Sequence, residues 1–267
     1  MNDTPVDIEM VTAQGIAVAT AWVGDVDTST TPIVWLHGLG GSSTVSFANV
    51  ATVLASSGWR SLLIDLPGHG HSEVPENWPY TIEAMASLVM EVVAGLADGP
   101  VKLFGHSMGG SVAIICAHHF PGAIERLIVA EPNLDPATGT ISPRIARRSE
   151  DHFVTQGYPA LPRATRLLAD KGDIESRDWL QTLEMASPMA LHRCATSLMA
   201  HRSLSFGEQL AALSIPVATI RGERSSFETI RGDDSLTGYV VPDAGHQMFA
   251  GNPGAFVEIL DHILRRT

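Results

Sequence analysis

The stretch LFGHSMGGSVA, residues 103–113, governs the interpretation of this chain. It places Ser107 between Gly105 and Gly109 and joins an apolar run to a run of small residues. A G-x-S-x-G sequence between a strand and a helix is typical of a sharp turn that exposes the serine hydroxyl. Such a turn brings backbone segments very close together, so we expect that only glycine fits at 105 and 109. We interpret Ser107 as a nucleophile; the alternative is a glycine-rich turn with an incidental serine.

Strands and helices are expected to alternate on both sides of this turn. Residues 8–23 indicate an antiparallel hairpin, and helical patterns cover residues 45–57, 80–99, 108–120 and 253–266. This alternation predicts right-handed β-α-β crossovers and a mostly parallel sheet. The expected buried strands lie in the segments IVWLHG (33–38), WRSLLIDLPG (59–68), VKLFGHS (101–107), IERLIVAEP (124–132), IPVATIRG (215–222) and GYVVPDAGH (238–246).

The alternation stops over residues 133–212, which show helical patches and no convincing strand. We predict a core domain formed by 1–132 and 213–267, with 133–212 inserted as a helical cap over the carboxyl edge of the sheet. The segment holds 9 of the 17 Lys and Arg residues and 9 of the 29 Asp and Glu residues, so it is neutral. A neutral cap that carries Trp179, Met185 and Met189 suits a largely apolar ligand; the alternative is that these side chains only pack the cap.

Composition narrows the class of protein. The chain has 267 residues, a net charge of −12 and 45% hydrophobic residues. This charge disfavours nucleic acid and anionic membrane surfaces as partners. The apolar runs are shorter than the ~20 residues of a membrane span, and the first residues lack a signal-peptide pattern. Cys116 and Cys194 match no metal or redox spacing. We expect a cytoplasmic monomer or homodimer whose partner is a small-molecule substrate.

A serine hydroxyl needs a base to act as a nucleophile at neutral pH. His246 is the best candidate, because it lies in VVPDAGHQMF (240–249) between the last expected strand and the last helix. His106 is next to the serine in sequence, but adjacent side chains diverge at such a turn, so we expect it to pack beside the site. His69 and His71 have no further ligands at useful spacing, so we expect them to line a loop rather than to bind metal.

A second glycine-rich loop, LHGLGGS (36–42), follows the first long strand. We expect it to direct the amide of Leu39 at the oxygen that the amide of Met108 also serves, and two such donors form an oxyanion hole. The alternative is a simple strand-to-helix turn. Gly38, Gly40 and His106 are candidate substrate contacts, together with the three cap residues named above.

These motifs resemble those of the α/β-hydrolase family. VWLHGLGGS, LLIDLPGHGHS, LFGHSMGGSVA and PDAGHQMF occur in the family's order, and the resemblance extends over residues 32–262. It implies an α/β fold with a mostly parallel eight-stranded sheet, flanking helices and an inserted cap. Ser107 and His246 match the family's nucleophile and base. A serine nucleophile argues against the haloalkane dehalogenase and epoxide hydrolase branches, which need a carboxylate there.

The triad acid departs from the commonest family pattern. Many members carry an aspartate shortly after the strand that corresponds to VATIRG, and here the expected position holds Ser225. Other branches take the acid from the end of the strand before the cap, where LIVAEP places Glu131. A carboxylate at the tip of an apolar strand is costly to bury without a partner. Glu131 is therefore our preferred acid, and Glu223, Glu228 and Asp135 are alternatives.

The resemblance and the motifs lead to a serine hydrolase as the first hypothesis. It would cleave a carboxylic ester or lactone of a small, largely apolar substrate through an acyl-enzyme. No metal and no organic cofactor is implied.

Two alternatives remain. A hydrolase that cleaves the carbon–carbon bond of a vinylogous diketone uses the same triad and needs cationic groups for a substrate carboxylate. The cap offers Arg144, Arg147, Arg148 and Arg193 for this role. A ligand-binding receptor on the same fold would keep the triad without using it.

Overall fold

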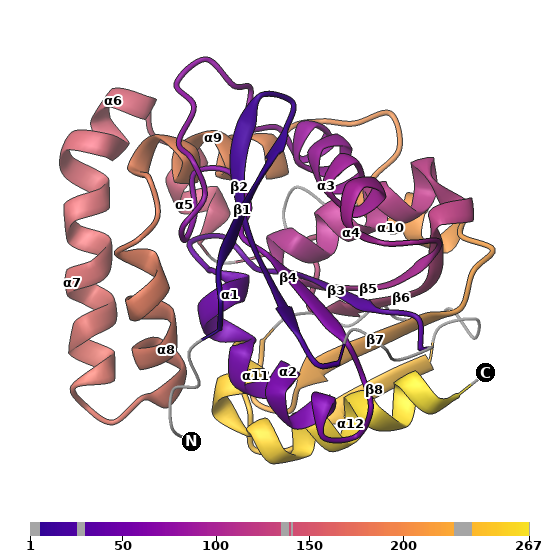
Figure 1. Cartoon of the computed structure of the whole chain (residues 1–267). Helices are drawn as coiled ribbons and strands as arrows, with labels where there is room; N and C mark the ends of the chain where they lie inside the picture. Colours follow the sequence, from indigo (N-terminus) through magenta and orange to yellow (C-terminus); the bar gives the residue numbers. More distant parts are fainter. Residues whose placement is uncertain (1–5, 26–29, 135–138, 140, 227–236, 267) are drawn as a thin grey trace.

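The computed structural model describes residues 6–25, 30–134, 139, 141–226 and 237–266. In these residues eight strands form one sheet in the order β1-β2-β4-β3-β5-β6-β7-β8 (Figure 1). β2 is antiparallel to β1 and β4, and the remaining neighbours are parallel. This confirms the predicted mostly parallel, eight-stranded α/β architecture. The strands are β1 (Glu9–Ala13), β2 (Ile16–Val23), β3 (Ile33–Leu36), β4 (Ser61–Ile64), β5 (Val101–His106), β6 (Ile124–Ala130), β7 (Val217–Gly222) and β8 (Thr237–Val241).

The central strands are apolar along their whole length because helices cover both faces of the sheet. Along β3, Val34 and Leu36 face one hydrophobic cluster, and Ile33 and Trp35 face the other. The first face is covered by α3 (Ile82–Leu96) and α4 (Met108–His119), and the second by α2 (Ala48–Ala55) and α12 (Pro253–Arg265) (Figure 1).

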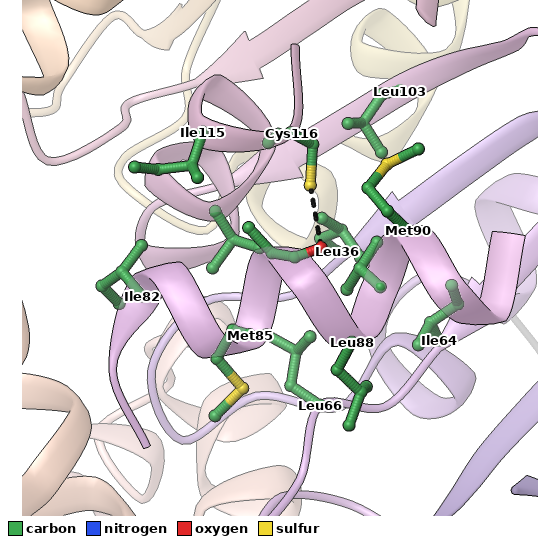
Figure 2. Packing of buried hydrophobic residues seen from close by; sticks show 14 of the residues in the cluster. Leu36, Ile64, Leu66, Ile82, Met85, Leu88, Met90, Leu103, Ile115 and Cys116 are labelled. Atoms are coloured by element: carbon green, nitrogen blue, oxygen red, sulfur yellow. Dashed lines mark hydrogen bonds between the residues drawn. The ribbon is translucent and has the colours of Figure 1, made fainter. Parts of the chain in front are cut away.

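Figure 2 shows the packing on the first of these faces. Met85 and Leu88 of α3 lie in the same buried cluster as Leu36 and Leu103 of the sheet. The Cys116 Sγ donates a hydrogen bond to the Ala86 carbonyl oxygen of α3 at 3.6 Å. This thiol therefore joins two helices of the core.

The helix predicted over 45–57 is two helices, α1 (Ser43–Ser46) and α2, which meet at Phe47. The Phe47 ring is fully buried against Trp35 and Phe104. A further short helix that the sequence analysis did not predict, α11 (Met248–Gly251), follows β8. It directly follows the loop that carries His246.

The elements described between β6 and β7 are helices, and some of them form a small hydrophobic cluster of their own. Buried residues of this cluster include Phe153, Leu183 and Leu191. α7 and α8 pack on each other beside the sheet (Figure 1), whereas α10 packs on α4. The extent of the cap, 133–212, stays a prediction. The elements are α5 (Ser142–Ala146), α6 (Glu150–His152), a π-helical turn (Phe153–Gly157), α7 (Tyr158–Ala169), α8 (Ile174–Leu183), α9 (Pro188–Leu198) and α10 (Phe206–Ala211).

Candidate active site

Ser107 lies at the abrupt junction of β5 and α4. Its φ of 52° and ψ of −118° are unfavourable for a residue with a side chain. Its N–H donates to the Ala130 carbonyl oxygen at 2.9 Å, which ties the turn to β6. A Cβ atom at Gly105 would overlap the carbonyl of Gly109, and one at Gly109 would overlap the carbonyl of Leu36. The close backbone approach expected around this serine is therefore present.

His246 and Glu131 form a direct pair, although 115 residues separate them in sequence. The imidazole Nδ1 lies 2.6 Å from the Glu131 Oε2, and the two side chains are 33% and 2% exposed. The carboxylate also accepts the Gly222 N–H at 2.9 Å and the Ser225 hydroxyl at 2.7 Å. These three donors compensate the burial of the charge, and they orient the imidazole.

The alternative acids occupy other places. Glu223 is exposed, and its carboxylate accepts the Asp243 N–H at 2.9 Å. Glu228 and Asp135 lie outside the described residues. Ser225, at the position where an aspartate is common, instead donates to Glu131.

His37 orders the glycine-rich loop beside the serine. Its Nε2 accepts the Leu66 N–H at 2.9 Å, so its proton resides on Nδ1, which donates to the Gly38 carbonyl oxygen at 2.8 Å. Burial lowers the pKa of His37, which favours this neutral form. The Gly41 N–H donates to the same Gly38 oxygen at 2.9 Å. The His37 side chain thus ties the loop to itself and to Leu66, shortly after the end of β4.

The loop approaches the serine closely. A Cβ atom at Gly38 would lie 3.1 Å from the Ser107 Cβ. Leu39 lines the cavity that contains Ser107, and Met108 is the first residue of α4. The first N–H groups of a helix have no intrahelical acceptor, so they can bind an anionic oxygen.

His106 connects the serine turn to the loop of His246. Its Nε2 donates to the His246 carbonyl oxygen at 2.9 Å, and the two ring centres are 4.6 Å apart. Burial, with the neighbouring His246 as a further cause, holds the pKa of His106 well below its usual value. This imidazole is therefore neutral and acts as a backbone anchor.

His69 and His71 lie around the buried Asp65. The His71 Nδ1 is 3.4 Å from the Asp65 Oδ2, and His69 stacks near His37 with ring centres 5.1 Å apart. Burial lowers the pKa of His69 to about 3. Within the described residues, no three His, Cys, Asp or Glu side chains are grouped as metal ligands would be.

A cavity of about 390 Å³ contains both Ser107 and His246. Trp179 of α8 lines it, whereas Met185 and Met189 are not among its lining residues. Met189 packs instead against the main core. Further apolar lining comes from Leu39, Phe47, Ile141, Leu168 and Phe249.

The four cap arginines considered for a substrate carboxylate do not line this cavity. Arg193 is engaged by Glu150, with its Nε 2.9 Å from the carboxylate. Arg224 does line the cavity, near the end of β7, and the sequence analysis did not single it out.

Glu175 is another residue that the sequence analysis missed. Its carboxylate accepts the N–H groups of Gly245 and Gln247, on either side of His246, at 2.5 and 2.9 Å. Gly245 and Glu175 are 70 residues apart in sequence. No local motif marks such a contact, because it exists only once α8 has packed beside the loop of His246.

The mixed sheet, with a strand–serine–helix turn at its centre, defines the class of α/β-hydrolase folds. A profile of the alpha/beta hydrolase fold matches residues 31–178, and the chain belongs to that family. No helix in the described part of the chain is long and apolar enough to cross a bilayer.

Three known proteins illustrate the similarity. A 2-succinyl-6-hydroxy-2,4-cyclohexadiene-1-carboxylate synthase of Serratia proteamaculans is 28% identical over 87% of this chain and 92% of that protein. The esterase Rv0045c of Mycobacterium tuberculosis is 26% identical over 97% of this chain and 89% of its own. The enol-lactonase of Burkholderia xenovorans LB400 has a TM-score of 0.80 at 19% identity, covering 97% of this chain and 100% of that one. At that identity the structural likeness shows the fold alone.

Proposed function

We propose that this protein is a serine hydrolase of carboxylic esters or lactones. One observation carries the proposal: Ser107, in a strained turn, and His246 line one cavity, and His246 is hydrogen-bonded to Glu131. These are the three parts that activate a serine hydroxyl: nucleophile, base and orienting acid. Similarity to a curated esterase supports the same reaction class.

The reaction begins when the Ser107 Oγ attacks the substrate carbonyl carbon and His246 accepts its proton at Nε2. Glu131, bound to Nδ1, keeps the imidazole in this tautomer and stabilises the imidazolium. The amides of Leu39 and Met108 bind the oxygen that becomes negative. His246 then donates its proton to the leaving alkoxide, which leaves an acyl-serine and an alcohol.

Hydrolysis of the acyl-serine uses the same groups in reverse. His246 takes a proton from water, whose oxygen attacks the acyl carbon, and returns the proton to the Ser107 oxygen as the acid leaves. For a lactone, the alcohol and the acid belong to one product molecule. These steps balance with water as the only co-reactant.

The cavity points to a small substrate. A volume of about 390 Å³ is near the lower end for ligand pockets, and Trp179, Leu39 and Phe249 give it apolar walls. We propose that the cap, 133–212, covers the reacting carbonyl and excludes bulk water. The proposed partner is this small molecule, with no nucleic acid and no membrane.

The test is a panel of nitrophenyl esters and simple lactones, assayed with the wild type and Ser107→Ala. We expect turnover of short acyl chains and a loss of about 10⁴- to 10⁶-fold in kcat for the variant. A fluorophosphonate probe should label the wild type at Ser107 only. Absence of both turnover and labelling would overturn the proposal.

The two other candidate functions give different results in the same experiment. A carbon–carbon bond hydrolase would bleach a coloured dienol substrate and leave the esters intact. A receptor would bind a ligand and release it unchanged.

A further inference from the structure

One face of α8 touches both loops that flank the reacting groups. Glu175 and Trp179 are four residues apart on this helix, so they lie on the same side of it. Glu175 binds the loop of His246 through two backbone N–H groups. The Trp179 Nε1–H donates to the Leu39 carbonyl oxygen at 3.1 Å.

The core loops have glycines where these two side chains pack against them. A Cβ atom at Gly40 would lie 3.0 Å from the Trp179 Nε1. A Cβ atom at Gly245 would lie 2.7 Å from one Glu175 oxygen, and one at Gly251 would lie 2.5 Å from the other. α8 also packs on α1 and α11, the helices that follow these two loops.

We infer that Glu175 and Trp179, together called the α8 clamp, are positioning residues for catalysis. Glu175 fixes the backbone on both sides of His246. Trp179 fixes the Leu39 carbonyl, in the peptide that directly follows the one whose N–H is the proposed oxyanion donor. Base and oxyanion donor are thereby set at the correct separation only while the cap is seated. This inference rests on the proposed function, because it assigns these roles to His246 and Leu39.

His246 is then held from three directions. Glu131 holds its Nδ1, His106 holds its carbonyl oxygen, and Glu175 holds the amides of the residues before and after it. The first two contacts come from the core and the third from the cap. Loss of Glu175 leaves the imidazole paired with Glu131 but frees its backbone to shift, and a shift of about 1 Å costs on the order of 100-fold in rate.

The experiment compares Glu175→Gln and Glu175→Ala with the control Glu184→Gln. Glu184, at the end of the same helix, pairs with Arg166 and does not line the cavity. We expect kcat on a nitrophenyl butyrate to fall between about 10- and 100-fold in Glu175→Ala, with KM nearly unchanged. Glu175→Gln keeps one acceptor oxygen, so its kcat should lie between those of Glu175→Ala and the wild type. Glu184→Gln should match the wild type.

The second half of the clamp is tested with Trp179→Phe, which keeps a ring but removes the N–H donor. Its control is Trp59→Phe, where the lost indole bond goes to Asp261 on the far side of the core. Both clamp residues act through one helix. The fold-loss in kcat of the double variant Glu175→Gln, Trp179→Phe should therefore be smaller than the product of the fold-losses of the two single variants. Strictly multiplicative losses would overturn the idea of a single clamp.

Hydrogen exchange separates this inference from the proposed function. Deuterium uptake in the peptide over residues 242–249 should be faster in Glu175→Ala than in Glu184→Gln, whether or not any ester is cleaved. Unchanged uptake overturns the clamp. In an active enzyme, a Glu175→Ala kcat within twofold of the wild type also overturns it. A wild type that neither turns over esters nor reacts with fluorophosphonate refutes the proposed function instead.

Discussion

Two neighbouring strands of the sheet, β5 and β6, are each followed by a non-glycine residue with positive φ, and the two residues reach this conformation by different means. At Ser107, with φ of 52°, the glycines two residues before and after it allow backbone segments to touch. At Glu131, with φ of 45°, the conformation is accompanied by hydrogen bonds from the end of β7. A local motif therefore encodes the Ser107 turn, whereas the Glu131 turn depends on a distant segment.

Glu131→Ala should lower kcat by about 10⁴-fold, because the base loses the group that sets its tautomer. Glu223→Ala is the matched control, since Glu223 is exposed and its carboxylate accepts the Asp243 N–H. Steady-state kinetics on a reactive ester measure both. A near-normal kcat in Glu131→Ala together with an inactive Glu223→Ala would show that Glu223, which directly follows β7, is the acid.

Gly109→Ala should destabilise the fold by about 3 kcal/mol, because the new methyl group overlaps the Leu36 and His37 carbonyls. Gly95→Ala is the control: a Cβ atom there meets nothing within 4 Å, so the change should stabilise α3 by no more than about 1 kcal/mol. Urea unfolding measures both changes. Equal stability of the two variants would show that the serine turn is not sterically constrained.

Acidification should destabilise the folded chain through three buried histidines. Burial lowers the pKa of His37 and His106, and it lowers the pKa of His69 to about 3 from its ordinary 6.5. The unfolded chain therefore binds more protons than the folded chain below pH 6.5, so the free energy of unfolding falls as pH falls toward 3. At pH 5, His69 alone should account for about 2 kcal/mol of this loss.

This pH dependence is tested by urea unfolding of the wild type and His69→Gln at pH 7.5 and 5.0. The variant should show a pH-dependent loss smaller by about 2 kcal/mol than that of the wild type. His201→Gln, at an exposed position, should keep the wild-type dependence. An unchanged dependence in His69→Gln would contradict the prediction.

Ser225→Ala should lower kcat by about 10-fold, with little change in KM. It removes one of the donors that hold the Glu131 carboxylate but leaves the bond to His246 in place. The effect should nearly vanish in a Glu131→Ala background, because the two residues act through one contact. If the effects of Ser225→Ala and Glu131→Ala on kcat were fully additive in free energy, Ser225 would act elsewhere.

Much of the fold was predictable because its signals are local. The apolar strands and the helices between them lie where periodicity indicated. Helix starts follow local residue types too: the Thr81 hydroxyl accepts the Ala84 N–H at the start of α3, and the Ser187 hydroxyl accepts the Ala190 N–H at the start of α9. The break at Phe47 was not predicted, because it depends on how that ring packs against the sheet.

The candidate site divides in the same way. Trp179 was singled out as an apolar cap residue and does line the cavity, but the same criterion also selected Met185 and Met189, which do not. Side-chain type alone cannot show which way a helix faces. Glu175 was missed because a carboxylate on a charged helix usually faces solvent.

The sequence by itself determined the serine turn, since steric exclusion at Gly105 and Gly109 acts between atoms only a few residues apart or in the adjoining strand. It also favoured Glu131 over Glu223, Glu228 and Asp135 as the acid, because a carboxylate at the tip of an apolar strand needs a partner. Only the tertiary structure shows the contacts of these groups, because it brings the end of β7 to Glu131 and the face of α8 to the loop of His246. Hydrogen bonds between distant segments exist only after the core and the helices beside it have packed, so no local pattern encodes them.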